Sequence, residues 1–96
     1  ADVQNKPAAA VVVCRRGGAT AAMQALQMPF QMMNMLIVTS QYWNIAYGRV
    51  PGQAAEDSEG MQTMRTLANN MAWMLKSLHR EDAPEREPWQ PMHFIR

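Results

Sequence analysis

The sequence predicts an α/β fold in which helices cover both faces of a parallel β-sheet. Two short apolar runs, residues 8–14 (AAAVVVC) and 35–38 (MLIV), show no alternation of apolar and polar side chains. Such runs are typical of strands that are buried on both sides. One helical pattern lies between them and a second one follows. Strand, helix and strand in this order form a βαβ unit, for which we expect a right-handed crossover.

The first helix is predicted between the two strands. Its apolar face repeats every three or four residues and consists of Met23, Leu26, Phe30 and Met33. Thr20, which follows two glycines, is expected to cap this helix. Pro29 is expected to kink it or to separate its last turn, because proline removes a backbone N–H.

Residues 39–57 (TSQYWNIAYGRVPGQAAED) show no clear period and predict a long loop. Loops of this length are uncommon in compact domains and are usually functional or disordered. The three aromatic residues argue against disorder. We therefore expect residues 41–50 to be ordered by contacts outside the βαβ unit, including contacts with another chain.

The second helix is predicted to begin after Asp57 or Ser58, either of which can cap it. Its apolar face consists of Met64, Leu67, Ala68, Met71, Leu75 and Leu78. From residue 81 the chain becomes charged and rich in proline, which predicts an extended tail over residues 81–96. Trp89 and Phe94 in this tail are candidate anchors on a neighbouring surface.

Composition excludes several functional classes. The chain has 96 residues, and its nine basic and eight acidic residues give a net charge of +1, which argues against a nucleic-acid-binding protein. No apolar run approaches the length of a membrane span. Cys14 is the single cysteine, which excludes an internal disulfide and favours a reducing, cytoplasmic setting. His79 and His93 match no standard metal-ligand spacing, so no metal site is predicted.

The predicted elements do not make a complete domain. Two parallel strands and two helices cannot cover both faces of a sheet, and each strand lacks a neighbour on one edge. Residues 1–80 are therefore predicted to be the second half of a larger three-layer α/β/α domain. We expect that this chain does not fold alone as a monomer and that it pairs with a complementary N-terminal half or with further copies of itself.

Four segments together resemble the C-terminal half of a known family. They are KPAAAVVVCRRGGATAAMQAL, MLIVTSQYWNIAYG, EDSEGMQTMRTLANNMAWMLK and the terminal FIR. This pattern is similar to flavodoxin-like NAD(P)H-dependent FMN reductases, in particular the branch that includes iron–sulfur flavoproteins. The resemblance implies a five-stranded parallel sheet of order 2-1-3-4-5, with FMN at the carboxyl ends of the strands. The phosphate-binding loop and the cluster cysteines of that family have no counterpart here, so FMN is not expected to bind tightly to this chain alone.

The residues that the resemblance assigns to the flavin lie in two places. In the turn after the first strand, the resemblance implies that the flavin is contacted by Cys14, Arg15, Arg16, Gly17 and Gly18. In the long loop, it implies contact by Tyr42, Trp43 and Asn44. Independently of the resemblance, glycines allow a backbone to approach a flat ring, and arginines can stabilise the negative charge of a reduced flavin. The alternatives are an ordinary βα turn with solvated arginines, a structural cysteine and an aromatic cluster that only packs.

Two functions from different classes follow. The first is an oxidoreductase that takes hydride from NAD(P)H at N5 of FMN, with no catalytic residue assigned in this chain. The second is a non-catalytic interaction module that has kept half of the fold and lost the cofactor.

Overall fold

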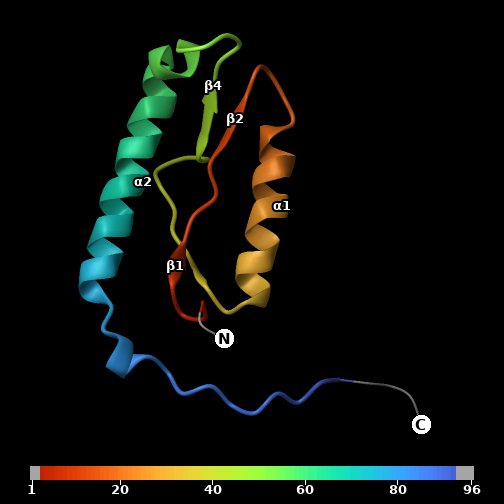
Figure 1. Cartoon of the computed structure of the whole chain (residues 1–96), viewed down its shortest axis with the longest axis vertical. Helices are drawn as coiled ribbons and strands as arrows, with labels where there is room; N and C mark the ends of the chain where they lie inside the picture. The colour runs from red at the N-terminus through yellow and green to blue at the C-terminus, as the bar shows by residue number, and fades with distance from the viewer. Residues whose placement is uncertain (1–2, 93–96) are drawn as a thin grey trace.

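The computed structural model describes residues 3–92 and contains two helices and four short strands. The helices are α1 (Ala19–Met32) and α2 (Ser58–Ser77), and the strands lie between them (Figure 1). The strands are β1 (Pro7–Ala8), β2 (Val12–Cys14), β3 (Leu36–Ile37) and β4 (Ile45–Tyr47). Both strand pairs, β1 with β3 and β2 with β4, are parallel. The predicted α/β class with parallel strands is therefore confirmed.

The first predicted strand, residues 8–14, is divided into β1 and β2, so its predicted extent is wrong. Its even-numbered residues nevertheless make the hydrogen bonds in both pairs. The segment that pairs with it, residues 36–48, is called the partner segment. The carbonyl groups of Lys6 and Ala8 accept hydrogen bonds from the partner segment, the N–H of Val12 donates to it, and the carbonyl of Cys14 accepts from it. The strand is interrupted because its partner leaves between the two pairs, and regular pairing is lost over residues 9–11.

The partner segment shows that the prediction of one loop over residues 39–57 is also wrong. It contains β4 and a 3₁₀ turn, η1 (Gln53–Glu56). Pro7 lies opposite Leu36 and Val12 lies opposite Ile45, so the partner accommodates four more residues between the two pairs than the first strand does. Residues 39–44 form this excursion, after which the second strand resumes as β4. The predicted strand 35–38 is reduced to β3.

Helix α1 begins at Ala19, and Gly18, with φ of 89°, takes the cap position. The prediction that Thr20 caps the helix is wrong, because Thr20 already lies in the first turn. Pro29 lies inside α1 and does not separate its last turn, since the helix continues to Met32. Of the predicted apolar face, Met23 is buried, whereas about half of the Leu26 side chain stays exposed.

Helix α2 begins where predicted, with Asp57 as its cap. One carboxylate oxygen of Asp57 accepts from the N–H of Gly60 at 2.9 Å, and the other accepts from the N–H of Tyr47 at 2.9 Å. These two hydrogen bonds lower the pKa of Asp57. A Cβ on Gly60 would lie 3.1 Å from the Cα of Ala46, so this glycine lets the helix approach β4 closely.

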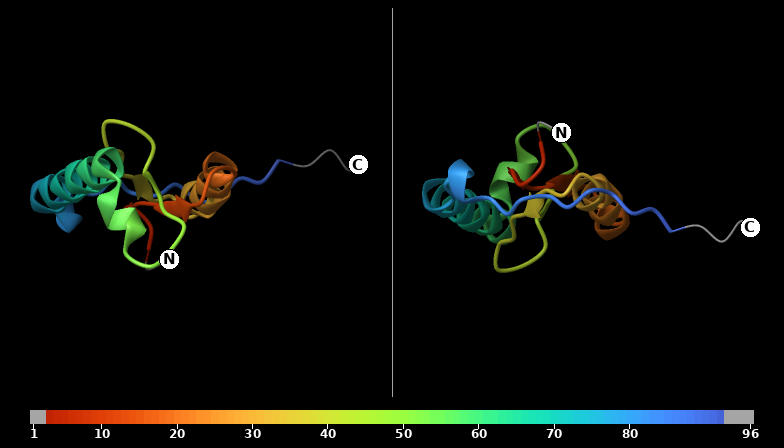
Figure 2. Two further views of the ribbon diagram at one scale, coloured as in Figure 1. Left: turned by 90° about the horizontal axis from the view of Figure 1, so that it is seen from above. Right: turned by 90° about the horizontal axis from the view of Figure 1, so that it is seen from below.

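The apolar face of α2 is only partly covered. Leu67 is buried, Met64 and Met71 are partly buried, and Leu75 is 58% exposed. Seen along the strands, α1 and α2 lie on opposite sides of them (Figure 2). Helix α1 packs on β2 and β3, whereas α2 packs on β4 and β1.

The tail starts with a 3₁₀ turn, η2 (Arg80–Asp82), and then runs without helix or strand to residue 92. Trp89 is 79% exposed, so it does not anchor the tail on this chain, and its contact with a neighbouring surface stays a prediction. Phe94 and His93 lie outside the described residues. Within residues 3–92, no helix combines the length and the apolar character needed to cross a membrane.

Candidate functional site

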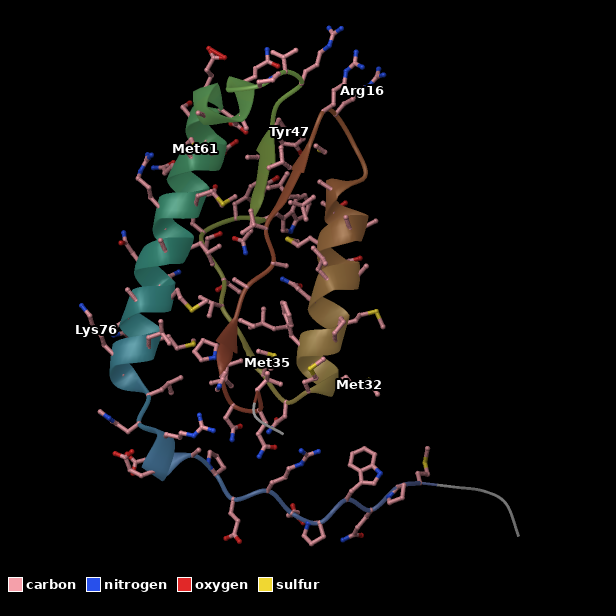
Figure 3. The ribbon with its side chains drawn as sticks, viewed as in Figure 1. Arg16, Met32, Met35, Tyr47, Met61 and Lys76 are labelled. Carbon is pink, nitrogen blue, oxygen red and sulfur yellow. The ribbon has the colours of Figure 1, made fainter. Side chains whose placement is uncertain are left out.

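The turn from Arg15 to Gly18 lies at the carboxyl end of the strands. Strand β2 ends at Cys14 and α1 begins at Ala19, so the turn joins a strand end to a helix start. Figure 3 shows Arg16 at this end of the molecule, pointing away from the strands. Both arginines are exposed, and the turn therefore presents two positive charges to solvent next to the first turn of a helix.

The backbone of this turn is open. An added Cβ would meet no atom within 4 Å at either Gly17 or Gly18. No side chain caps the N-terminus of α1, and its first intrahelical bond runs from the N–H of Ala22 to the carbonyl of Gly18. The N–H groups of the first helical turn therefore remain available, and the helix dipole makes this end positive.

A second loop follows β4 at the same end. Tyr47 lies opposite Cys14 in the strand register, and the N–H of Gly48 donates to the carbonyl of Cys14 at 3.1 Å. The N–H groups of Arg49 and Val50 both donate to the side-chain oxygen of Gln53, at 2.7 and 3.3 Å. This loop therefore has a defined shape and brings a third arginine to the carboxyl end of the strands.

Cys14 is partly exposed. It therefore differs from the fully buried apolar residue that is the common role of a lone cysteine. Its position at the end of β2 places it beside the turn, opposite Tyr47.

The other predicted site residues lie in the excursion of residues 39–44. Tyr42 and Trp43 stack on one another with ring centroids 5.0 Å apart and are 58% and 51% exposed. Strand β4 continues for three residues beyond Asn44. At about 3.3 Å per residue, the excursion therefore ends about 10 Å before the carboxyl end of the strands. The structure does not bring this aromatic pair to the Arg15–Gly18 turn.

Asn44 is a structural bridge within the chain. Its side chain is 3% exposed, its Nδ2 donates to the carbonyl of Ala10 at 3.1 Å, and its Oδ1 accepts from Ser40 Oγ at 2.6 Å. The carbonyl of Ala10 would otherwise face the gap that the excursion leaves. The Asn44 side chain thus replaces a missing backbone hydrogen bond of the strand pair.

Helix α2 holds the excursion from its other side. Gln41 Nε2 donates to Thr63 Oγ1 at 3.1 Å, and Asn70 Nδ2 donates to the carbonyl of Thr39 at 2.7 Å. Contacts outside the βαβ unit therefore do order this segment, as predicted. Contact with another chain stays a prediction.

Tyr47 is a neighbour of the turn that the sequence did not identify. The signal that could have found it is the short run Ile45–Tyr47, whose β-branched and aromatic ends favour a strand. If that run pairs with Val12–Cys14, Tyr47 must lie beside Cys14.

Two cavities lie away from this turn. A cavity of about 770 Å³ opens at the amino ends of the strands, where Lys6, Leu36, Leu78 and Arg86 contribute to its lining. A second one lies where the tail passes the end of α1. Among the described residues, those that line these two cavities do not include the Arg15–Gly18 turn. The same residues contain no group of three or more His, Cys, Asp or Glu side chains that could hold a metal ion.

No protein-family model, curated protein or solved structure matches this chain.

Proposed function

We propose that this chain is part of an FMN-binding oxidoreductase of flavodoxin-like fold, and that the Arg15–Gly18 turn contacts the flavin ring. The observation that carries this proposal is the open Gly17–Gly18 backbone between a parallel strand and an uncapped helix N-terminus. A flat ligand can approach such a backbone closely, and an anionic group is favoured there.

The residues present fit one part of the cofactor. The exposed arginines and the free N–H groups of α1 suit the edge of the ring where a reduced flavin carries negative charge. When bound, FMN would supply hydride transfer from NAD(P)H through its N5. The chain would orient the ring through the glycine backbone, and Tyr47 and Arg49 would border it from the neighbouring loop. A complementary N-terminal half would complete the site.

A direct binding experiment tests this proposal. Titration of the purified chain with FMN and with riboflavin, followed by flavin fluorescence, should give weak binding of similar affinity for both, because the turn addresses the ring and not the phosphate. The double substitution Arg15→Ala and Arg16→Ala should weaken binding about tenfold, equivalent to about 1.4 kcal/mol. Arg65→Ala, an exposed arginine on α2, is the matched control.

Two results would count against the proposal: no flavin binding at millimolar concentration, or binding that the double substitution leaves unchanged. Either would favour the second candidate, a non-catalytic interaction module. The observation in favour of that candidate is the large apolar surface that the chain leaves uncovered, including Val13 at 56% and Leu75 at 58% exposure.

A further inference from the structure

The segment from Lys6 to Cys14 has one paired edge and one open edge. Its even-numbered residues make the hydrogen bonds to the partner segment: the carbonyls of Lys6, Ala8 and Cys14 accept from it and the N–H of Val12 donates to it. At Ala10 the carbonyl accepts from Asn44 Nδ2. Neighbouring residues of an extended strand direct their N–H and C=O groups to opposite edges. The odd-numbered residues therefore direct theirs to the open edge.

The open edge has no strand on it in the described part of the chain, because each sheet there contains two strands. Ala9, Val11 and Val13 each offer an N–H and a C=O group on this edge, whereas Pro7 has no N–H. The row is apolar, with no charged side chain between Lys6 and Arg15. Natural proteins usually protect such an edge with charges, bulges or a covering element.

One face beside this edge is also uncovered. Val13 lies opposite Ala46 in the strand register, so the two side chains share a face. Ala46 is 1% exposed, beneath Gly60 of α2. Val11 and Val13 are 46% and 56% exposed, because α2 packs over β4 and does not extend over β2. The open edge thus adjoins a strip of exposed valine.

The exposed area is larger than a complete domain of this size would have. The chain exposes 7806 Å², whereas a compact monomer of the same mass exposes about 5,600 Å². The radius of gyration is 17.0 Å, against about 12.5 Å expected for a compact domain of this length. The extended tail accounts for part of both differences. The whole excess, with the tail included, is about 2,200 Å², compared with the roughly 800 Å² that each partner buries in a stable interface.

We propose that a second copy of this chain pairs with this edge in antiparallel orientation, around a two-fold axis at Val11. A parallel pairing of two identical edges about a two-fold axis would place N–H opposite N–H, so closed self-pairing must be antiparallel. With the axis at Val11, each Val11 faces its copy and each Ala9 faces Val13. All three residues that carry a free N–H then exchange both hydrogen bonds with their partners. Pro7, which has no N–H, falls outside the paired stretch.

The self-pairing does not depend on the proposed flavin site. It brings Val11 against Val11 of the copy and Val13 against Ala9 of the copy, so the contact that pairs the open edge also covers part of the exposed strip. The proposal also explains why the open edge can remain free of charges: in the dimer it is an interior strand.

A charge-exchange experiment at the two-fold axis tests the proposal on the full chain without flavin. Sedimentation equilibrium should show a dimer for the unchanged chain. V11K and V11E should each be monomeric, because like charges then face one another across the axis. An equimolar mixture of the two should form the dimer again, because opposite charges now meet. M32K, at a side chain 89% exposed on α1, should remain dimeric, and circular dichroism should show that every variant is folded.

Four outcomes would overturn the proposal: a monomer for the unchanged chain, open assemblies larger than a dimer, a V11K variant that stays dimeric, or a V11K and V11E mixture that stays monomeric. A fifth such outcome is a one-to-one complex with a different polypeptide that occupies the edge. Because association is measured without flavin, these results are independent of the titration that tests the flavin site.

Discussion

Replacement of Asn44 by alanine tests whether one side chain holds the interrupted strand pair together. The buried Asn44 side chain bonds to the carbonyl of Ala10 and to Ser40. Ala10 is itself only 4% exposed, so Asn44→Ala leaves its carbonyl buried without a partner. An unsatisfied buried polar group costs about 1–3 kcal/mol. With the loss of the Ser40 contact, we expect the free energy of unfolding to fall by about 2–3 kcal/mol, a large share of the roughly 5–15 kcal/mol of a typical domain.

Urea unfolding followed by tryptophan fluorescence measures this loss. With a slope of about 1 kcal/mol per molar urea for a chain of this size, the midpoint should shift by about 2–3 M. The protein concentration must be the same for all variants, because association contributes to the measured stability. Asn69→Ala, at an exposed asparagine on α2, is the control and should change stability by less than about 0.5 kcal/mol.

Asn44→Asp separates the hydrogen bond from the shape of the side chain. It places an acceptor oxygen and a buried charge against the carbonyl of Ala10, so it should destabilise the protein more than the alanine variant does at neutral pH. If Asn44→Ala unfolds at the same urea concentration as Asn69→Ala, the bridge does not hold the strand pair and the reasoning is refuted.

Two further predictions concern the turn and the helix cap. Gly18→Ala should lower the free energy of unfolding by about 1–2 kcal/mol, because φ of 89° is strained for a residue with a Cβ. Gly17→Ala is the control, because the space around Gly17 is open, and it should show no such loss in the same urea assay. Equal losses for the two variants would contradict the argument. The folded-state pKa of Asp57 is lowered by hydrogen bonds from Gly60 and Tyr47, so its stabilisation is complete above the unfolded pKa of about 4 and is lost as the pH falls through the folded value. Asp57→Asn should therefore be less stable at pH 7 and should show a smaller fall in melting temperature between pH 5 and pH 2; an unchanged pH profile would exclude this role.

Apolar periodicity predicted the main elements because it depends on local sequence. The presence of strands within the runs 8–14 and 35–38 follows from residues close together in the chain, although the extents of these strands do not. The two helices and the start of α2 at Asp57 follow in the same way. The position of the Arg15–Gly18 turn also follows, since a strand that leads through glycines into a helix must place its turn at the strand end. Periodicity does not show whether an apolar face is covered, which is why Leu26 and Leu75 lie on predicted apolar faces and yet are 48% and 58% exposed.

The excursion and β4 could not be predicted from local sequence. Ile45–Tyr47 is too short to be distinguished from loop without its pairing partner, and that partner lies more than 30 residues earlier in the chain. The helix start was misplaced for a related reason. Thr20 is a good capping residue, but the left-handed backbone at Gly18 had already begun the helix.

The two proposals are linked by the geometry of the open edge. In a parallel sheet the carboxyl ends of neighbouring strands lie at the same end, so a parallel strand beside β2 would add its own carboxyl-end loop next to the Arg15–Gly18 turn. An antiparallel copy does the opposite. With the two-fold axis at Val11, Pro7 of the copy lies opposite Arg15, and Lys6 brings a further positive charge to a turn that is already basic. A second copy therefore makes the backbone hydrogen bonds of the open edge but adds no loop that could contact the flavin. A complementary half must displace that copy before the flavin site can be completed.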